Sequence, residues 1–156
     1  MNKKIIFKIC IILFVIAVDL ITKFAFSGMS FTLIPGLLGV CYNSRLNEGV
    51  AGGLFSGYTP IIIVVSLVMI VFLILFDAKY KPDSKLYSLG LCFVVGGAIG
   101  NLIDRIVLGG VRDFIVFEFW RDFPTFNVAD SFIVVGVVLL AIYILFFNKE
   151  DKKEKK

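Results

Sequence analysis

The sequence predicts an all-α membrane protein with four transmembrane helices and β-like segments outside the membrane. Of its 156 residues, 59% are hydrophobic, and the mean hydropathy is +0.97, whereas about half of a soluble domain is apolar. Four apolar runs reach or approach the ~20 residues that cross ~30 Å of hydrocarbon. Basic residues gather in short segments beside those runs, a pattern of membrane topology rather than of nucleic-acid binding. We therefore expect no nucleic-acid partner.

The four spans are expected in a single domain, residues 1–156, at about residues 5–25, 59–76, 86–103 and 131–147. Lys3 and Lys4 precede the first run, as in a secretory signal peptide. Three more spans follow, however, and Asp19 and Lys23 interrupt the end of the first run, where a signal segment would be apolar. We predict that the first helix is retained.

The distribution of lysine and arginine predicts the orientation in the membrane. The N-terminal segment, the connection at 77–85 and the tail after Phe147 hold 11 of the 16 basic residues. Basic loops remain in the cytoplasm, so both termini are expected there. The two long connections, 26–58 and 104–130, would then face outward.

The outward connections and the adjacent span ends carry the unusual features of this chain. Strand-like stretches are FTLI (31–34), LLGVCY (37–42) and VRDFIVFEFW (111–120). Polar residues at this side are Asn47, Asn101, Asp104, Arg105, Asp113, Asn127 and Asp130. Ionisable groups near the hydrocarbon boundary are costly and usually functional, which predicts a site at the outer membrane face.

The composition excludes several kinds of site. The chain has no histidine, so Ser-His-Asp triads, Cys-His dyads and most zinc sites are excluded. Its cysteines are Cys10, Cys41 and Cys92, far apart and without a C-x-x-C motif, so we expect neither a disulfide nor a metal cluster. The predicted chemistry needs no cofactor.

Several polar residues allow two interpretations from the sequence alone. Asp19 and Lys23 have the i,i+4 spacing of a favourable helix pair, which could be structural or could hold an active site. Gly97, Asn101 and Asp104 share one helical face, beside Gly96 and Gly100, whose spacing permits close packing. Arg105 could cap its helix or bind a carbonyl or phosphate with its planar fork.

The same ambiguity applies to the two remaining aspartates. Asn127 and Asp130 have the spacing of an N-cap and an N3 residue, like a capping box. Asp113 could be a turn aspartate in water. If it lies in a strand, it shares an apolar face with Val111 and Ile115, and burial would raise its pKa.

A meeting of Asp113 and Asp130 would produce a specific chemistry. Two carboxylates in contact do not both ionise easily, so one keeps a proton near neutral pH. The ionised partner could take a proton from water as it attacks a peptide carbonyl, and the protonated partner could hydrogen-bond that carbonyl. This is aspartic peptidase chemistry.

Five blocks of the chain match a known family in order and in placement at the outer span ends. The chain resembles bacterial lipoprotein signal peptidase, also called signal peptidase II, in DLITK (19–23), NEGVAGGLFS (47–56), GGAIGNLIDR (96–105), VRDF (111–114) and FPTFNVADS (123–131). The resemblance implies an aspartic endopeptidase of the bacterial cytoplasmic membrane. Its substrate would be a prolipoprotein cut just before a diacylglyceryl-modified cysteine.

The resemblance also implies roles for individual residues. Asp113 and Asp130 would be catalytic, and Asn47, Asn101, Arg105 and Asn127 would contact the substrate or the antibiotic globomycin; Asp19, Lys23 and Asp104 would support the site. The strand-like stretches would form a cradle for the substrate. The partners would be lipid-modified prolipoproteins and membrane lipid. One chain holds every part of the site, so we expect a functional monomer.

The second block departs from the family pattern, in which N-x-G-A-A precedes an aromatic residue. Val50 replaces the first alanine and Gly52 the aromatic residue. Two alternatives also remain. A transporter or channel subunit would use Asp104, Asp113 and Asp130 at the outer face as proton or cation sites. Such a protein would be expected to carry polar residues near span centres or inverted repeats, whereas the polar groups of this chain cluster at one end of the spans. A Ser-Lys peptidase would pair Lys23 with Ser56 or Ser131.

Overall fold

The computed structural model describes residues 3–41, 46–49, 54–80 and 82–147. Its helices are α1 (Lys3–Ala25), α2 (Thr59–Tyr80), α3 (Lys85–Leu108), α4 (Val128–Ile142) and the π-helical turn η1 (Tyr143–Phe147), which continues α4. All four long helices, with η1 counted in the last, are long and apolar enough to cross a membrane. The predicted fold class is therefore confirmed, and each expected span lies within one helix.

Local sequence signals set the ends of α3. Ser84 is the N-cap, and its side chain accepts a hydrogen bond from the backbone N–H of Tyr87. Gly109 ends the helix in the left-handed conformation with φ of 83° and donates its N–H to the carbonyl of Arg105. Glycine adopts this conformation without a Cβ penalty, so α3 stops just before the segment that carries Asp113.

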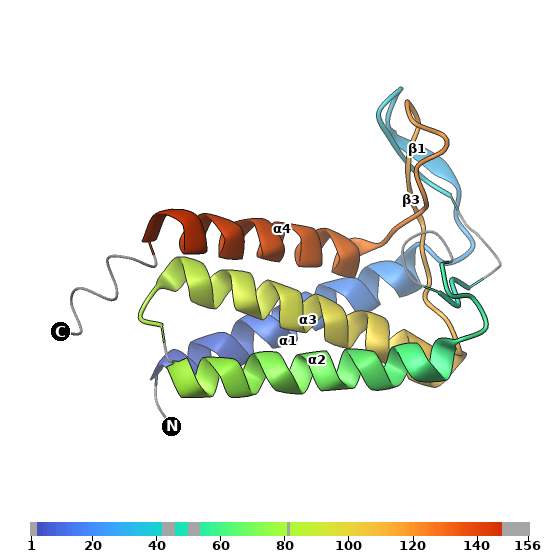
Figure 1. The fold of residues 1–156 in the computed structure, drawn as a ribbon. Helices are drawn as coiled ribbons and strands as arrows, with labels where there is room; N and C mark the ends of the chain where they lie inside the picture. The colour runs from blue at the N-terminus through green and yellow to red at the C-terminus, as the bar shows by residue number, and fades with distance from the viewer. Residues whose placement is uncertain (1–2, 42–45, 50–53, 81, 148–156) are drawn as a thin grey trace.

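The outer connections form a small antiparallel sheet in the order β1-β2-β3. Its strands are β1 (Phe31–Ile34), β2 (Leu38–Val40) and β3 (Ile115–Phe117). Leu38 is opposite Phe117, and Val40 is opposite Ile115. The sheet rises from one end of the bundle, beside the start of α4 (Figure 1).

The third expected strand is shorter than the sequence predicted. Residues 112–114 are not in a strand, and Val111 forms only an isolated bridge with Asn47. The glycine turn at 109–110 and the contacts of Arg112 with α3 hold this segment against the helix end. Asp113 therefore does not share a strand face with Val111 and Ile115.

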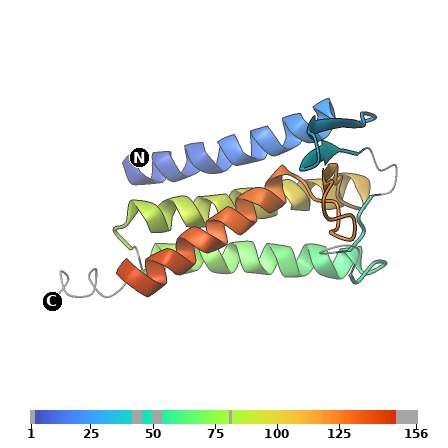
Figure 2. The same ribbon diagram turned by 90° about the horizontal axis from the view of Figure 1, so that it is seen from above.

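Helix α3 is the centre of the bundle and packs against α1, α2 and α4 (Figure 2). Glycines make this packing close, as the spacing of Gly96 and Gly100 predicted. A Cβ on Gly96 would lie 2.8 Å from Cβ of Val15, and a Cβ on Gly100 would lie 2.5 Å from Oδ2 of Asp19. The face of α3 that carries Asn101 and Asp104 is thereby brought against α1.

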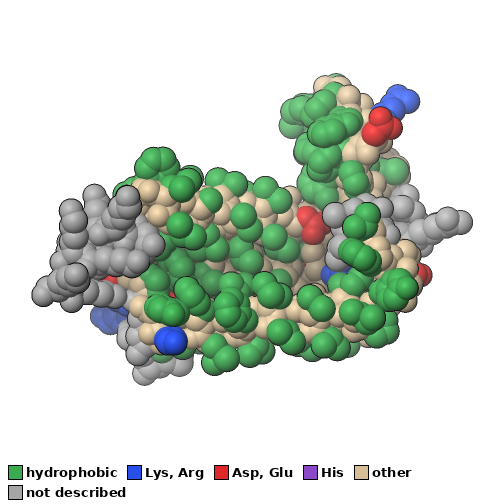
Figure 3. Space-filling model, viewed as in Figure 1, with side chains coloured by type: hydrophobic (Ala, Val, Ile, Leu, Met, Phe, Trp, Pro, Cys, Tyr) green, Lys and Arg blue, Asp and Glu red, His purple; other side chains and the backbone are tan. Residues whose placement is uncertain are grey.

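The two ends of the bundle differ in their polar groups. Opposite the sheet, Lys4 and Lys8 of α1 pair with Asp83 and Asp77 at 2.6 and 2.7 Å. These pairs bring the first two basic segments together, and α4 finishes at the same end (Figure 1). The surface between the ends is mostly hydrophobic (Figure 3). The lysines of the tail lie outside the described residues, as does the sequence departure at Val50 and Gly52.

Candidate active site

Asp130 lies in the first turn of α4 as part of a capping box. The side-chain oxygen of Asn127 accepts a hydrogen bond of 3.0 Å from the backbone N–H of Asp130. In return, the carboxylate of Asp130 accepts a hydrogen bond of 3.1 Å from the backbone N–H of Asn127. The capping interpretation is thus confirmed. A helix N-terminus also stabilises a carboxylate, so capping and a chemical role are compatible.

Asp113 follows the α3 turn and is only 9% exposed. Its Oδ2 accepts a hydrogen bond from Asn47 Nδ2 at 2.9 Å, and its Oδ1 accepts one from Asn127 Nδ2 at 2.7 Å. Burial raises the pKa of Asp113 to about 6, against the lowering by the Asn47 hydrogen bond and with a further rise from the charge of Asp130. A buried aspartate whose pKa is raised this far above its ordinary value is a candidate catalytic group.

Two buried amides connect the aspartates. Asn127 Nδ2 donates to Asp113 and also to Asn101 Oδ1, at 3.0 Å. Asn101 Nδ2 donates in turn to Asp130 Oδ1 at 2.7 Å. This chain fixes the orientation of both amide groups, because each must present its NH₂ to a carboxylate. The two carboxylates are thereby held in one hydrogen-bonded unit.

Lys23 lies behind the amides, fully buried with Asp19. The pair is joined at 2.8 Å, and Lys23 Nζ also donates to Asn101 Oδ1 at 3.0 Å. Asp19 accepts the backbone N–H of Ala129 at the start of α4 at 3.0 Å. The pair is thus a buried ion pair that also contacts Asn101 and Ala129, and these two residues lie beside Asp130.

Asp104 connects the end of α3 to the segment before Asp113. It lies 3.4 Å from Lys23 and forms an ion pair with Arg112 at 2.7 Å. The family resemblance implied a supporting role for Asp104, and Arg112 was not among the predicted site residues. The sequence does carry a signal for this ion pair: a basic residue stands directly beside Asp113, eight positions after Asp104 and across a glycine turn.

Arg105 makes contacts of both kinds that its sequence position allowed. Its Nη2 donates to the carbonyl oxygen of Gly49 at 2.7 Å. It also lies in the last turn of α3, where its Nη1 donates to the Asn101 carbonyl of the same helix at 3.4 Å, while the Gly109 backbone closes the helix. Asn47, two residues before Gly49, exchanges backbone hydrogen bonds with Val111 at 2.8 and 2.9 Å. Arg105 and Asn47 thus secure the 46–49 loop beside the aspartates.

A cavity of about 880 Å³ opens beside both aspartates. The charged and amide residues of its lining are Asn47, Asn101, Arg105, Asp113 and Asp130, and hydroxyl groups come from Ser66, Thr125 and Ser131. The remaining wall is mainly apolar and comes from α2, α3, α4 and the 123–126 segment; it includes Ile62, Ala98, Ile133, Val134, Pro124 and Phe126. Two carboxylates therefore meet an apolar space large enough for a sizeable ligand.

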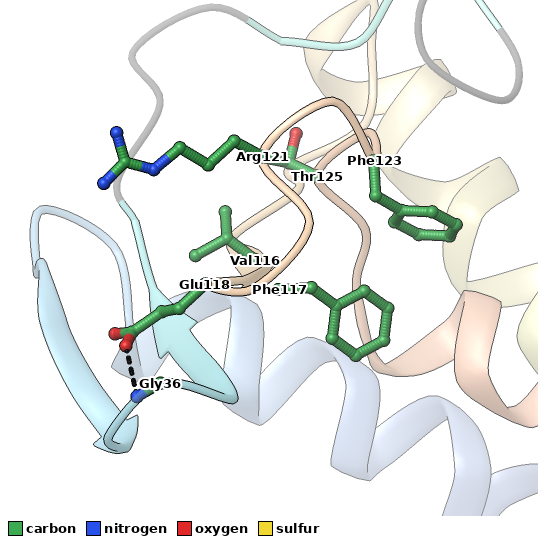
Figure 4. A pocket seen from close by; sticks show the side chains of 7 residues that line it. All are labelled: Gly36, Val116, Phe117, Glu118, Arg121, Phe123 and Thr125. Carbon is green, nitrogen blue, oxygen red and sulfur yellow. Dashed lines mark hydrogen bonds between the residues drawn. The ribbon is translucent and has the colours of Figure 1, made fainter.

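A second hollow, of about 480 Å³, lies on the sheet and shares Phe117, Phe123 and Thr125 with the first cavity. Glu118 accepts hydrogen bonds from Thr32 and the Gly36 N–H at 2.6 and 2.8 Å, which lower its pKa. In the segment 116–125, the side chains of Arg121 and Glu118 point to one side, and those of Phe117 and Phe123 point to the other (Figure 4). The lining of this hollow contains neither Asp113 nor Asp130.

The serine–lysine alternative does not match this geometry. Ser131 Oγ donates to the carbonyl of Asn127 at 3.2 Å, and Ser56 Oγ lies 3.5 Å from Glu48. Lys23 binds Asp19 and Asn101 instead of either serine. All nine residues predicted from the sequence gather at one end of the bundle. Asn127, which was predicted to contact substrate, is fully buried and is not among the residues that line the cavity.

Comparison with known proteins shows the family of the chain. Residues 11–146 match the family model described as signal peptidase (SPase) II. The chain belongs to the signal peptidase II family. Similar family members are the lipoprotein signal peptidases of Clostridium novyi (strain NT), 37% identical over 88% of this chain and 97% of that protein, and of Staphylococcus aureus, 35% identical over 95% and 94%.

Solved structures agree with the family in fold. A bacterial membrane enzyme determined in meso has a TM-score of 0.80 and 34% identity, covering 96% of this chain and 91% of its own. A second has a TM-score of 0.79 and 33% identity, covering 90% and 94%. The chain is therefore a multi-pass membrane protein of a peptidase family, and the comparisons give no support to a transporter or channel.

Proposed function

We propose that this protein is an aspartic endopeptidase that removes the signal peptide from diacylglyceryl-modified prolipoproteins by cleaving before the lipidated cysteine. One observation supports the catalytic type above all. Asp113 and Asp130, from different segments, line one cavity and are linked through Asn127 and Asn101. Family membership supports the substrate class.

The surroundings of the two aspartates suggest which one holds the proton. Asp113 is the more buried, and its pKa is raised to about 6. Asp130 accepts N–H donors from Asn101 and Asn127 at the start of α4, where a negative charge is stabilised. We assign the resting proton to Asp113 and the charge to Asp130.

The reaction then follows from these protonation states. Asp130 takes a proton from water, and the oxygen of that water bonds to the scissile carbonyl carbon while Asp113 donates a hydrogen bond to the carbonyl oxygen. The tetrahedral intermediate collapses as the amide nitrogen receives the proton from Asp130 and the C–N bond breaks. The products are a carboxylic acid and a free amine, and the aspartate pair retains one proton.

The mixed lining of the cavity suits a lipid-anchored substrate. The apolar wall from α2 and α4 can receive acyl chains, while the scissile bond reaches the polar part. In this proposal the site faces the outside of the bacterial cytoplasmic membrane, and both termini are cytoplasmic. Every proposed catalytic and binding group lies on one chain, so the enzyme acts as a monomer and contacts membrane lipid around its apolar surface.

Cleavage of a diacylglyceryl-modified prolipoprotein by purified protein tests the proposal. Asp113→Asn and Asp130→Asn keep the size and polarity of each residue but remove its ionisable carboxyl. Each is expected to lower kcat by at least about 10³-fold, because loss of one acid–base group costs 10²–10⁴ and the two act as a unit. Asp104→Asn is expected to retain measurable activity, since Asp104 supports the site without lining the cavity.

The Asp130 variant separates a chemical role from helix capping. Asp130 is the N3 residue of the capping box, and the amide oxygen of an asparagine there can still accept the hydrogen bond from the Asn127 N–H. Asp130→Asn should therefore remain folded, with a melting temperature close to that of the wild type. Normal cleavage by Asp130→Asn would leave Asp130 as a helix cap only, and the proposed mechanism would be wrong. A serine replacement at position 56 or 131 that abolishes cleavage would favour the Ser-Lys alternative.

A further inference from the structure

We propose that Arg112 is a positioning residue for both catalytic aspartates, an inference that rests on the function proposed above. Arg112 does not line the cavity described beside the aspartates. It lies next to Asp113 in the sequence and contacts Asp104, a residue that is itself in contact with Lys23. It therefore connects to one aspartate along the chain and to the other through side chains.

Arg112 is attached to Asp104 at three points. Its Nη2 donates to Asp104 Oδ1 at 2.7 Å, and its Nε and backbone N–H donate to Asp104 Oδ2 at 3.2 and 3.1 Å. A fork-shaped guanidinium on a carboxylate fixes direction as well as distance. Since Asp104 is only 1% exposed and belongs to the rigid helix α3, the attachment fixes both the side chain and the backbone of Arg112.

The first connection is to Asp113 through the backbone. The segment between the end of α3 and β3 has no strand pairing at residues 112–114. It is held on one side by the exchange of hydrogen bonds between Val111 and Asn47, and on the other by the Phe114 N–H donated to the carbonyl of Phe126. The contact with Asp104 is the backbone attachment between these two, directly before Asp113.

The second connection is to Asp130 through Lys23. Asp104 lies 3.4 Å from Lys23, while the ion pair with Arg112 is shorter, at 2.7 Å. A buried carboxylate without a close cation is strongly destabilised. With Arg112 in place, Lys23 remains on Asp19 and Asn101. Without it, Asp104 would attract Lys23 away from Asn101 Oδ1, and Asn101 would lose the contact that orients its NH₂ toward Asp130.

The test compares steady-state cleavage by Arg112→Gln, Arg112→Lys and wild type in the same lipid environment. Arg112→Gln removes the charge and the fork, and kcat is expected to fall about 10- to 100-fold, as for misplacement by about 1 Å. KM is expected to stay within about 2-fold, because the cavity lining is unchanged. Arg112→Lys restores the charge without the fork and should recover part of kcat.

Matched variants distinguish positioning from a general loss of folding. Arg121→Gln removes an exposed arginine of the sheet turn, which forms no ion pair within the described residues, and should match wild type. Asp104→Asn combined with Arg112→Gln should be little slower than Asp104→Asn alone, since both act through one contact. Lower thermal stability of Arg112→Gln with a normal kcat per folded enzyme would overturn the proposal.

The dyad variants separate this inference from the proposed function. If Arg112→Gln matches wild type while Asp113→Asn is inactive, the positioning role is wrong and the aspartic mechanism stands. If Asp113→Asn also cleaves normally, the proposed function itself fails. A multiplicative loss in the Asp104/Arg112 double variant would likewise overturn the positioning role, because it would show that the two residues act independently.

Discussion

At the scale of the residue, the site is a set of carboxylates whose charges are each balanced differently. Asp19 and Asp104 are paired with Lys23 and Arg112. Within the part of the chain that the structure describes, the hydrogen bonds to Asp113 come from the amides of Asn47 and Asn127. A buried carboxylate that faces amides rather than a cation retains its proton more readily. Asp113 therefore differs in kind from the paired aspartates around it.

The titration of Asp113 tests this difference directly. Infrared difference spectra, assigned by their loss in Asp113→Asn, should show its carboxyl ionising near pH 6 in wild type. Asp130→Asn should lower that pKa, because the charge of Asp130 contributes to the rise. Asn47→Leu should raise it, because the Asn47 hydrogen bond stabilises the ionised form.

The sign of each shift has a consequence for activity. The active pair holds one proton, so ionisation of Asp113 produces the inactive dianion, and the alkaline limb of kcat/KM should move to higher pH in Asn47→Leu. Asp122→Asn, which removes an exposed charge from the sheet turn, should leave the titration unchanged. Identical Asp113 titration in Asp130→Asn and wild type would show that the carboxylates do not interact.

The sequence predicted which polar residues lie together at this end of the bundle, but it could not predict their contacts. Polar residues at span ends are costly, which made Asn101, Asp113 and Asp130 conspicuous in the sequence. The bond between Lys23 and Asn101 joins residues 78 positions apart, and no local pattern encodes it. The role of Arg112 was missed for a related reason: its partner Asp104 is a neighbour only after Gly109 reverses the chain.

At the scale of the element, α3 determines where the aspartates lie. Gly97 allows α4 to approach so closely that an added Cβ would lie 2.5 Å from the carbonyl oxygen of Ala129, beside Asp130. Gly136 of α4 allows the same close approach of α3 and α4 farther from the site, where an added Cβ would lie 2.7 Å from the carbonyl oxygen of Gly90. The two glycines pack the same pair of helices at different distances from the site.

Alanine at each of these glycines should separate stability from activity. Overpacking costs about 1–3 kcal/mol, so Gly97→Ala and Gly136→Ala should both lower the melting temperature in detergent. Only Gly97→Ala displaces the first turn of α4, so it should also lower kcat per folded enzyme, by about 10-fold or more. Equal kcat in the two variants would show that the start of α4 tolerates displacement.

The sequence predicted which helices and strands form better than it predicted where they end. Apolar runs gave the four helices, because spanning requires about 20 such residues. Helix α2 continues through Asp77 to Tyr80 and α3 continues to Leu108, since backbone hydrogen bonding extends a helix past its apolar part. The third strand was predicted too long, because its alternation of side chains does not reveal that Arg112 is bound to α3.

At the scale of the whole molecule, the ion pairs of the basic segments and the Asp113–Asp130 pair lie at opposite ends of an apolar bundle. Lys4 and Lys8 pair with Asp83 and Asp77 at one end, and the aspartate pair lies at the other, beneath the sheet. The surface between them is mostly hydrophobic (Figure 3). A hydrophobic band of this kind fixes the depth of the molecule in a bilayer but does not fix which end faces outward.

The basic residues supply that direction, and it can be measured. Positive loops remain in the cytoplasm, so the Lys4 and Lys8 end should be cytoplasmic and the sheet should be outside. The test uses a variant in which Cys10, Cys41 and Cys92 are replaced, in bacteria whose cytoplasmic membrane is intact and whose outer envelope admits the reagent. Arg121→Cys on the sheet turn should react there with a membrane-impermeant maleimide. Lys85→Cys, exposed at the start of α3, should react only after the cytoplasmic membrane is opened. The reverse pattern would place the aspartates in the cytoplasm, where a substrate whose lipid-modified segment lies outside could not reach them.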